Sequence, residues 1–355
     1  MEIANDLFII FYFGEDPDMK AIAYYQSLPI SDVKSLQDIE LPEPTAGDRD
    51  LLVEVKAISV NPVDTKIRQN VQPEDGAGKV LGWDVAGVVK AVGSHVTLFK
   101  PGDKVFYAGS LTRPGANSEL HVVDERIVGH MPKTLSFAHA AALPLTAITA
   151  WELLFERLQI PQQKGEGAHS LLIVGAAGGV GSILTQLARK LTSLKVIGTA
   201  SRPETESWVN ELGAHHVLDH SKPLSEELKR VGLKHVTHVA SLTQTEQHLD
   251  QLVEALKPQG KLALIDDPKS LDVSKLKRKS LSLHWEFMYT RSMFETEDMI
   301  EQHNLLNRVA ELIDAGTLKT TFGEHFGTIN AENLRRAHAL LESGKAKGKI
   351  VLEGF

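Results

Sequence analysis

The stretch that decides the fold is Val174-Gly175-Ala176-Ala177-Gly178-Gly179-Val180-Gly181. An apolar segment, SLLIVGA (170–176), enters it, and an amphipathic segment, SILTQLARKL (182–191), leaves it. A strand, a glycine-rich turn and a helix in this order are typical of a dinucleotide-binding unit, in which the positive end of the helix faces a pyrophosphate. The alternative is a tight strand–helix turn that only packs.

Within this turn, each residue has an expected role. Ala176 stands where the usual G-x-G-x-x-G pattern has its first glycine, so the match depends on the strand and helix around it. We expect Gly178 to let the backbone approach the pyrophosphate and Gly181 to let the helix pack against the strand. The predicted cofactor-binding residues of the turn are Ala176, Gly178, Gly179, Val180 and Gly181.

The end of the second expected strand, KVIGTA (195–200), bears on the choice of cofactor. An NAD site usually has an acidic residue there to bind the ribose 2′-hydroxyl. This chain instead continues Ser201-Arg202, a hydroxyl followed by a guanidinium. Because Arg is permanently charged and binds phosphate with two parallel bonds, Ser201 and Arg202 favour the 2′-phosphate of NADP. Otherwise Arg202 is a solvated loop cation, and Glu204 is expected to start the next helix.

The rest of the chain divides into two patterns. Up to about residue 123 it is strand-rich and punctuated by glycine and proline, as expected for a barrel or sandwich. From residue 138 helical segments appear, with a break at Pro144, and then strands and helices alternate. This alternation predicts a parallel, doubly wound α/β sheet covered on both faces. The clearest early strands are 51–60, 83–92 and 104–109, and the later ones include 215–220, 235–242 and 261–266.

The composition limits the classes of protein that fit. The chain has 355 residues, a formal net charge of −8 and no cysteine. No block of like charge favours a nucleic-acid partner, and the lack of cysteine excludes disulfides and thiolate-bound zinc. No apolar run approaches the ~18 residues of a membrane span, so we expect no membrane partner and a cytoplasmic location.

Residues 1–18 differ in pattern from the rest of the chain. The apolar run LFIIFYF (7–13) is flanked by acids, whereas a secretory signal has a positive start. We interpret 1–18 as an N-terminal extension without chemistry. The alternative is an edge strand that pairs with another chain.

The order of segments resembles the medium-chain dehydrogenase/reductase superfamily, and within it the zinc-less quinone oxidoreductase branch, which includes zinc-type alcohol dehydrogenase-like proteins. The resemblance implies an α/β fold with a GroES-like, strand-rich catalytic domain (19–144 and 295–355) and a Rossmann NADP-binding domain (145–294). The motifs that carry it are NPVD (61–64), GWDVAGVV (82–89), PGDKVF (101–106), LPLTAITAW (143–151), GAAGGVGS (175–182), LGAHHVLDH (212–220) and GKIVL (348–352).

The resemblance also bears on metal binding. Zinc members of the superfamily carry Cys where this chain has Asn61, and His-Glu where it has Trp83-Asp84. A catalytic zinc needs three protein ligands and an open position, and a tryptophan cannot be one of them. We therefore expect no zinc, and a reaction that reduces an activated acceptor such as a quinone or an α,β-unsaturated carbonyl with hydride from NADPH.

Four residues are the predicted catalytic set. The resemblance implies that Asn61 lies beside the nicotinamide and the substrate carbonyl, and that Thr146 helps to seat the nicotinamide. Lys66 stands where quinone-type relatives often have a tyrosine, and either donates to the developing oxyanion or faces solvent. Tyr107 is a second candidate donor, with a core or rim tyrosine as the alternative.

Three later residues complete the predicted cofactor site. By resemblance His220 contacts the adenosine end, with a surface histidine as the alternative. Ser241 and Thr243 follow an expected strand, and the carboxyl ends of strands are where ligands bind in such sheets. The alternative for this pair is a solvent-facing loop.

The segment WEFMYTRSMF (285–294) is expected to be core or interface, with a cap over the substrate as the alternative. The resemblance implies a homodimer formed through an edge of the Rossmann domain, and a small-molecule substrate. Two other functions stay open. One is a metal-independent carbonyl or alcohol oxidoreductase, and the other is a non-enzymatic NADPH-binding sensor.

Overall fold

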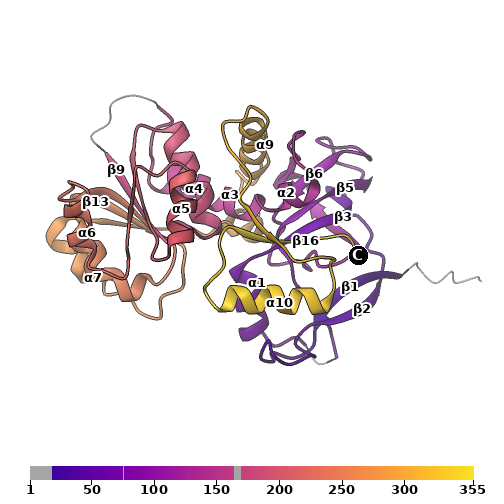
Figure 1. Cartoon of the computed structure of the whole chain (residues 1–355). Helices are drawn as coiled ribbons and strands as arrows, with labels where there is room; N and C mark the ends of the chain where they lie inside the picture. Colours follow the sequence, from indigo (N-terminus) through magenta and orange to yellow (C-terminus); the bar gives the residue numbers. More distant parts are fainter. Residues whose placement is uncertain (1–17, 75, 164–168) are drawn as a thin grey trace, which may run out of the picture.

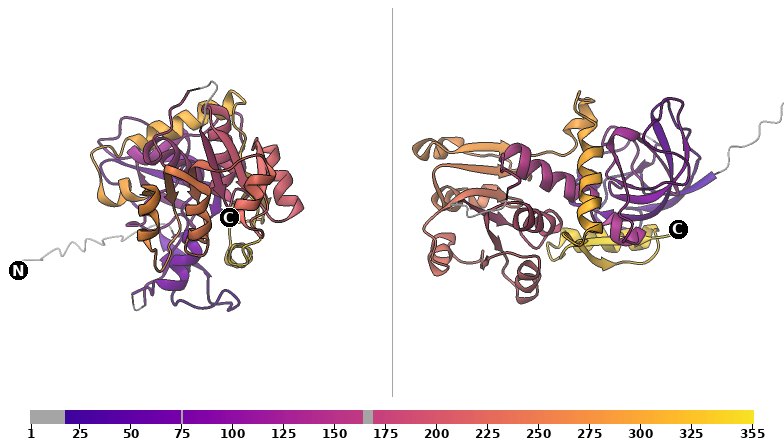
Figure 2. Two further views of the ribbon diagram at one scale, coloured as in Figure 1. Left: turned by 90° about the vertical axis from the view of Figure 1, so that its left-hand side faces the viewer. Right: turned by 90° about the horizontal axis from the view of Figure 1, so that it is seen from above.

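The computed structural model describes residues 18–74, 76–163 and 169–355, so the predictions for the apolar run 7–13 lie outside the described residues. Within the described chain, a strand-rich body and an α/β body lie side by side (Figure 1). Helix α3 (Pro144–Trp151) and helix α9 (Glu301–Asp314) run between them, as the view from above shows (Figure 2).

The α/β body is built on a parallel sheet with the strand order β11-β10-β9-β12-β13-β14. In β9, Leu171 and Ile173 join the core that includes α4 and α5, whereas Leu172 and Val174 join the core that includes α6 and α7. Because successive side chains of a strand point to opposite faces, both faces are covered, which confirms the predicted doubly wound α/β sheet. The elements are β9 (Ser170–Val174), α4 (Gly179–Leu191), β10 (Lys195–Thr199), α5 (Pro203–Glu211), β11 (His216–Leu218), α6 (Leu224–Arg230), β12 (Val236–Ser241), α7 (Thr245–Ala255), β13 (Leu256–Leu264) and β14 (Ser282–Trp285).

The strand-rich body has a main sheet with the order β15-β16-β3-β5-β6-β8, to which β7 adds beside β3, and a smaller sheet β2-β1-β4. The last strand, β16, pairs antiparallel with β3, so the end of the chain returns to the first body. The strands are β1 (Asp18–Tyr24), β2 (Gln37–Pro42), β3 (Asp50–Val60), β4 (Lys79–Val80), β5 (Val85–Val92), β6 (Lys104–Tyr107), β7 (Leu120–Asp124), β8 (Val128–His130), β15 (Phe322–His325) and β16 (Lys349–Glu353).

The predicted break at Pro144 is present. Helix α2 (Phe137–Ala141) ends before it, α3 has this proline in its first turn, and a π-helical segment (Glu152–Arg157) comes next. Against our expectation, this stretch, 137–157, is long and apolar enough to span a membrane by length and composition. Its most apolar window is 83% buried inside the protein, as in the core helix of a folded domain. The sequence prediction missed the length of this stretch because Pro144 interrupts the apolar pattern and charged residues occur at its end.

The remaining helices lie on the strand-rich side. Helix α9 packs on β8 and α3, and α10 (Ala331–Glu342) packs on α1 (Pro62–Asn70). Between β14 and α9 lies the short helix α8 (Thr290–Phe294). The predicted domain boundaries at 144/145 and 294/295 stay predictions.

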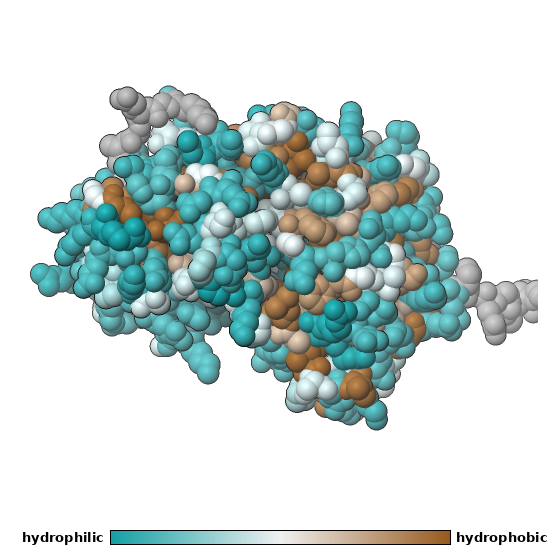
Figure 3. Space-filling view, viewed as in Figure 1, coloured by the Kyte–Doolittle hydropathy of each residue, from teal (hydrophilic) through white to brown (hydrophobic). Residues whose placement is uncertain are grey.

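The surface is mostly hydrophilic, with apolar areas more frequent over the strand-rich half of the face in Figure 3. On the α/β body, Trp285, Phe287 and Phe294 are exposed. Trp285 ends β14 and Phe287 follows it, and β14 is the last strand of its sheet, whereas Phe294 ends helix α8. Two exposed aromatic side chains therefore lie at this sheet edge.

Candidate functional site

The glycine-rich turn connects β9 to α4. Helix α4 begins at Gly179, and no side chain caps it. The amide groups of its first turn therefore remain available to an anion. A methyl group at Gly178 would meet nothing nearer than the Gly175 carbonyl oxygen, at 3.5 Å, whereas one at Gly181 would clash with that oxygen and with Ala176. The turn is thus open at Gly178 and tightly packed at Gly181.

The predicted residue His220 and the unpredicted Thr199 lie at the same edge of the sheet as this turn. The Thr199 hydroxyl, at the end of β10, accepts a hydrogen bond from the Gly175 amide at 3.1 Å. The Nδ1 atom of His220 lies 3.3 Å from the same hydroxyl, and burial lowers the pKa of His220. His220 is therefore half-buried next to the turn.

Ser241 and Thr243 separate in the structure. Ser241 is fully buried, and its hydroxyl lies 2.7 Å from that of Thr245. Thr243 is exposed, and its methyl carbon would lie 3.1 Å from a methyl group placed on Gly175. Thr243 therefore borders the turn, whereas the Ser241 hydroxyl is directed into the interior.

Arg202 lies just before α5, next to the exposed Ser201. Its Nη2 donates to the Lys345 carbonyl at 3.1 Å, and its Nε lies 3.2 Å from the Glu204 carboxylate. The guanidinium is thus at the end of the second strand and already has an acidic neighbour.

The strand-rich body contributes a buried polar cluster. Asn61 is the single residue between β3 and α1, and its side-chain Nδ2 donates to Asp84 Oδ2 at 2.8 Å. The other oxygen of Asp84 accepts from the Leu145 amide at 2.8 Å, next to Thr146 at the start of α3. Asp84 and Asn61 are both almost fully buried. The side chains at two of the three positions that the resemblance assigns to zinc ligands in metal-dependent relatives therefore bind each other.

Sequence reasoning missed the third member of this cluster, Lys349. Its side chain is 3% exposed, and its Nζ donates to Asp84 Oδ2 at 2.9 Å, to the Val60 carbonyl at 3.2 Å and to Asn61 Oδ1. The available signal was a lysine inside the apolar strand of the motif GKIVL (348–352). A charged residue in such a strand needs a buried partner.

Burial favours the protonated form of the carboxyl groups in and next to this cluster. It raises the pKa of Asp84, and the Lys349 ammonium opposes that rise. It also raises the pKa of Asp64 to about 7, although Asp64 accepts a hydrogen bond from the Asn61 amide. Tyr289 is also buried, and its hydroxyl has no hydrogen-bond partner among the described residues. Burial, and to a smaller extent the nearby Asp64 and Asp84, raise the pKa of Tyr289 well above the usual value.

The turn and the cluster meet at Gly179. A methyl group there would lie 2.8 Å from the Lys349 side chain and 3.0 Å from the Thr146 methyl. The Gly348 amide also donates to the Ala177 carbonyl, at 3.0 Å. The predicted Thr146 and the newly found Lys349 thus lie against the predicted cofactor-binding turn.

The other two predicted catalytic residues lie elsewhere. Lys66 is half-exposed and pairs with Asp267, which follows β13 in the α/β body, at 2.6 Å. Tyr107 is fully buried, its hydroxyl lies 2.9 Å from His121 Nδ1, and burial raises its pKa well above the usual value. Its placement fits the alternative of a core tyrosine.

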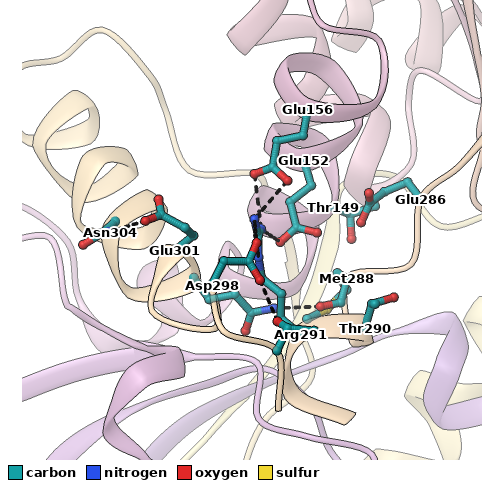
Figure 4. Close-up of polar contacts among 12 residues, drawn as sticks. Thr149, Glu152, Glu156, Glu286, Met288, Thr290, Arg291, Asp298, Glu301 and Asn304 are labelled. Atoms are coloured by element: carbon teal, nitrogen blue, oxygen red, sulfur yellow. Dashed lines mark hydrogen bonds and ion pairs between the residues drawn. The ribbon is translucent and has the colours of Figure 1, made fainter. Parts of the chain in front are cut away.

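The segment 285–294 is held by ion pairs (Figure 4). Arg291 pairs with Glu152 at 2.6 Å, with Asp298 at 2.8 Å and with Glu156 at 3.0 Å. Glu286 is buried and pairs with Arg157. This segment therefore combines a buried side with the exposed aromatic residues noted above.

Comparison with known proteins identifies the class. An alcohol dehydrogenase GroES-like domain matches residues 47–138, and a zinc-binding dehydrogenase domain matches residues 212–352. A zinc-type alcohol dehydrogenase-like protein of Staphylococcus aureus is 39% identical over 336 residues, which are 94% of this chain and 99% of that protein. The chain belongs to the medium-chain dehydrogenase/reductase family of oxidoreductases.

Two solved structures are close to this one. A Rhizobium etli protein, described provisionally as a zinc-dependent alcohol dehydrogenase, is 56% identical, with a TM-score of 0.92 over 96% of this chain and 99% of that one. The Escherichia coli quinone oxidoreductase complexed with NADPH is 27% identical, with a TM-score of 0.80 over 94% and 99%. The GroES-like and Rossmann-like architecture is therefore confirmed.

The family's zinc does not fit the side chains present here. Trp83 Nε1 donates to the Ser110 carbonyl at 3.2 Å, and the Asn61 and Asp84 side chains are bound to Lys349. A thiolate set is excluded because the chain has no cysteine. In the described parts of the chain no three His, Cys, Asp or Glu side chains gather as metal ligands.

Proposed function

We propose that the protein is an NADPH-dependent reductase of quinones or α,β-unsaturated carbonyls that works without a metal. The observation that carries the proposal is the meeting, at Gly179, of an uncapped helix start with the polar cluster of Asn61, Asp84 and Lys349. The first feature suits a pyrophosphate, and the second offers polar groups for a reacting carbonyl.

NADPH fits the chain's own residues. The open surface at Gly178 leaves room for the pyrophosphate, and Arg202 stands where the ribose 2′-phosphate is expected. The NADPH complex of the similar E. coli quinone oxidoreductase supports the same choice. Binding of the phosphate at Arg202 would replace the contact with Glu204.

When bound, NADPH supplies a hydride for the electrophilic carbon of the acceptor, whose oxygen gains negative charge and then takes a proton from solvent. The protein's part is to orient the acceptor and to stabilise that oxygen with groups that are already in place. Thr146, which lies against the turn, and Asn61, which is linked to the turn through Lys349, are the candidates for this role. Lys66 lies at the surface, where its pairing with Asp267 links the two bodies.

The cofactor part is tested with Arg202→Ala. Loss of a charge-assisted contact should weaken NADPH binding about tenfold to a hundredfold and leave NADH binding nearly unchanged. The matched variant Glu204→Gln removes the competing acid and should strengthen NADPH binding. Isothermal titration of both nucleotides measures this. Equal losses for NADPH and NADH in Arg202→Ala would reject the 2′-phosphate role.

The reaction is tested by following NADPH oxidation with a quinone, an enone and a simple ketone. Turnover of the quinone or the enone, unchanged by a chelator, is the expected result. Turnover of the ketone alone would favour a carbonyl oxidoreductase, and tight binding without turnover would favour a sensor. A rate lost to the chelator and restored by zinc would contradict metal independence.

We also propose a homodimer formed through the β14 edge. The exposed Trp285 and Phe287 at this edge support it, since exposed aromatics are frequent at interfaces. Light scattering of Trp285→Lys should show a shift toward monomer. An unchanged mass would place any interface elsewhere. The cytoplasmic location stays a prediction.

A further inference from the structure

The positions that bind zinc in metal-dependent relatives contain a cation of the protein itself. By the resemblance, Asn61 and Asp84 stand at two of those positions. The Lys349 ammonium touches both, and its three hydrogens are matched by three acceptors: Asp84 Oδ2, Asn61 Oδ1 and the Val60 carbonyl. No other described side chain places a positive charge on this pair.

Lys349 also reaches the turn next to Thr146, where the nicotinamide is expected. Its aliphatic part lies against Gly179 and Thr146, where a methyl group on the glycine would be 2.8 Å from it. The neighbouring Gly348 amide is bonded to the Ala177 carbonyl of the turn. The lysine side chain therefore lies between the two bodies: its ammonium is bonded within the strand-rich body, and its aliphatic part lies next to the turn of the α/β body.

We infer that Lys349 is the resident cation of this site and takes the place of the family's zinc. It acts as a positioning residue: it fixes the orientation of the Asn61 amide and balances the charge of Asp84, and its positive charge lies beside the nicotinamide. The inference rests on the proposed function, because it assumes that a nicotinamide binds next to Thr146.

The chemistry favours a lysine in this place. An ammonium offers three donors around a point charge, and the three acceptors here use all of them. Burial favours the neutral form of Asp84 by raising its pKa, and the Lys349 ammonium beside it favours the charged form. Because every donor is used, Lys349 acts on the acceptor through Asn61 and through its field rather than by direct proton donation.

The first test uses nucleotide binding, which needs no acceptor. The oxidised nicotinamide ring carries a positive charge and the reduced ring does not, so a nearby ammonium disfavours NADP⁺ relative to NADPH. Lys349→Met should therefore shift the ratio of the two dissociation constants about tenfold in favour of NADP⁺. Asp84→Asn should leave that ratio unchanged or move it toward NADPH, and Lys349→Arg, which keeps the positive charge, should not shift the ratio toward NADP⁺.

Two binding outcomes would overturn the inference. One is a ratio that does not move in Lys349→Met, and the other is an equal shift in Lys349→Met and Asp84→Asn. An unaltered protein that binds neither nucleotide would instead overturn the proposed function, and this inference with it. The failures of the two proposals are thus distinguishable.

The second test separates the charge from its structural effect. The double variant Lys349→Met/Asp84→Asn removes both buried charges together, so it avoids the unpaired carboxylate that can prevent Lys349→Met from folding. We expect it to bind NADPH as the unaltered protein does and to lose about a hundredfold in kcat, with little change in KM. Full recovery of kcat in the double variant would show that Lys349 only neutralises Asp84 and would overturn the inference.

Discussion

Two buried cations lie close to the contact between the two bodies, and their partners differ. Lys349 faces one carboxylate, Asp84, and two neutral acceptors. Arg291 faces three carboxylates, those of Glu152, Glu156 and Asp298. The lysine therefore contacts a single acid and touches the glycine-rich turn, whereas the arginine contacts three acids and holds the segment after β14 to the π-helical segment that follows α3. The lysine cluster is thus suited to a reaction in which charge changes, whereas the arginine cluster is suited to stabilising the fold.

The largest expected effect is on the arginine cluster. Arg291→Met should lower the free energy of unfolding by about 3–5 kcal/mol, because it leaves Glu152 buried without its cation. Urea unfolding measures this. The control Arg308→Met breaks an exposed pair with Glu311 and should cost at most about 1 kcal/mol. Similar losses in both variants would mean that burial does not separate the two kinds of pair.

The next effect concerns the glycines beside the lysine cluster. Gly179→Ala forces a methyl group against the Lys349 side chain and Thr146, and should cost about 1–3 kcal/mol of stability. Gly178→Ala meets only open surface and should cost less than about 1 kcal/mol, while it weakens NADPH binding by filling the space expected for the pyrophosphate. Unfolding curves and nucleotide titrations check the pair. If Gly178→Ala leaves NADPH binding intact, the pyrophosphate does not lie on this surface.

The pH dependence of stability should differ between the two clusters. Burial and the nearby Glu152 raise the pKa of Glu286 from 4.5 to about 9, and burial raises that of Asp64 from 3.8 to about 7. Between its unfolded and its folded pKa, each group is protonated in the folded protein and ionised in the unfolded chain. Stability therefore falls as pH rises through that interval, by at most about 1.4 kcal/mol per pH unit for each group. Glu286→Gln should flatten the fall up to about pH 9, and Asp64→Asn only up to about pH 7. Unfolding curves across this range check it; a slope unchanged in Glu286→Gln would contradict the raised pKa.

The smallest expected effect is at the exposed link between the bodies. Lys66→Met and Asp267→Asn should each change stability by less than about 1 kcal/mol, because both side chains are solvated. The measured kcat of the two variants then separates two roles for Lys66, a link between the bodies and a donor to the acceptor. Small and equal changes in kcat in both variants fit a link. A large loss in Lys66→Met alone would restore the predicted donor role.

The predictions from sequence succeeded where local pattern carries the information. The strand, turn and helix around Gly178 depend on neighbouring residues, and the structure has them where expected. Of the predicted catalytic residues, Thr146 lies against the turn, whereas Tyr107 is paired with His121 inside the strand-rich body. A single sequence does not reveal which face of a sheet a tyrosine in an early strand points to when both faces are apolar.

The sequence was sufficient to predict the fold class, because the alternation of strands and helices and the glycine pattern depend on short-range geometry. It was also sufficient for the expectation that zinc is absent, because that expectation depends on the chemistry of single side chains. The resident cation required the folded chain. Lys349 lies 288 positions from Asn61, and they meet because β16 pairs with β3 and carries a lysine into the interior. Spacing along a chain does not constrain such a contact, since the pairing of distant strands is fixed by the packing of the whole sheet.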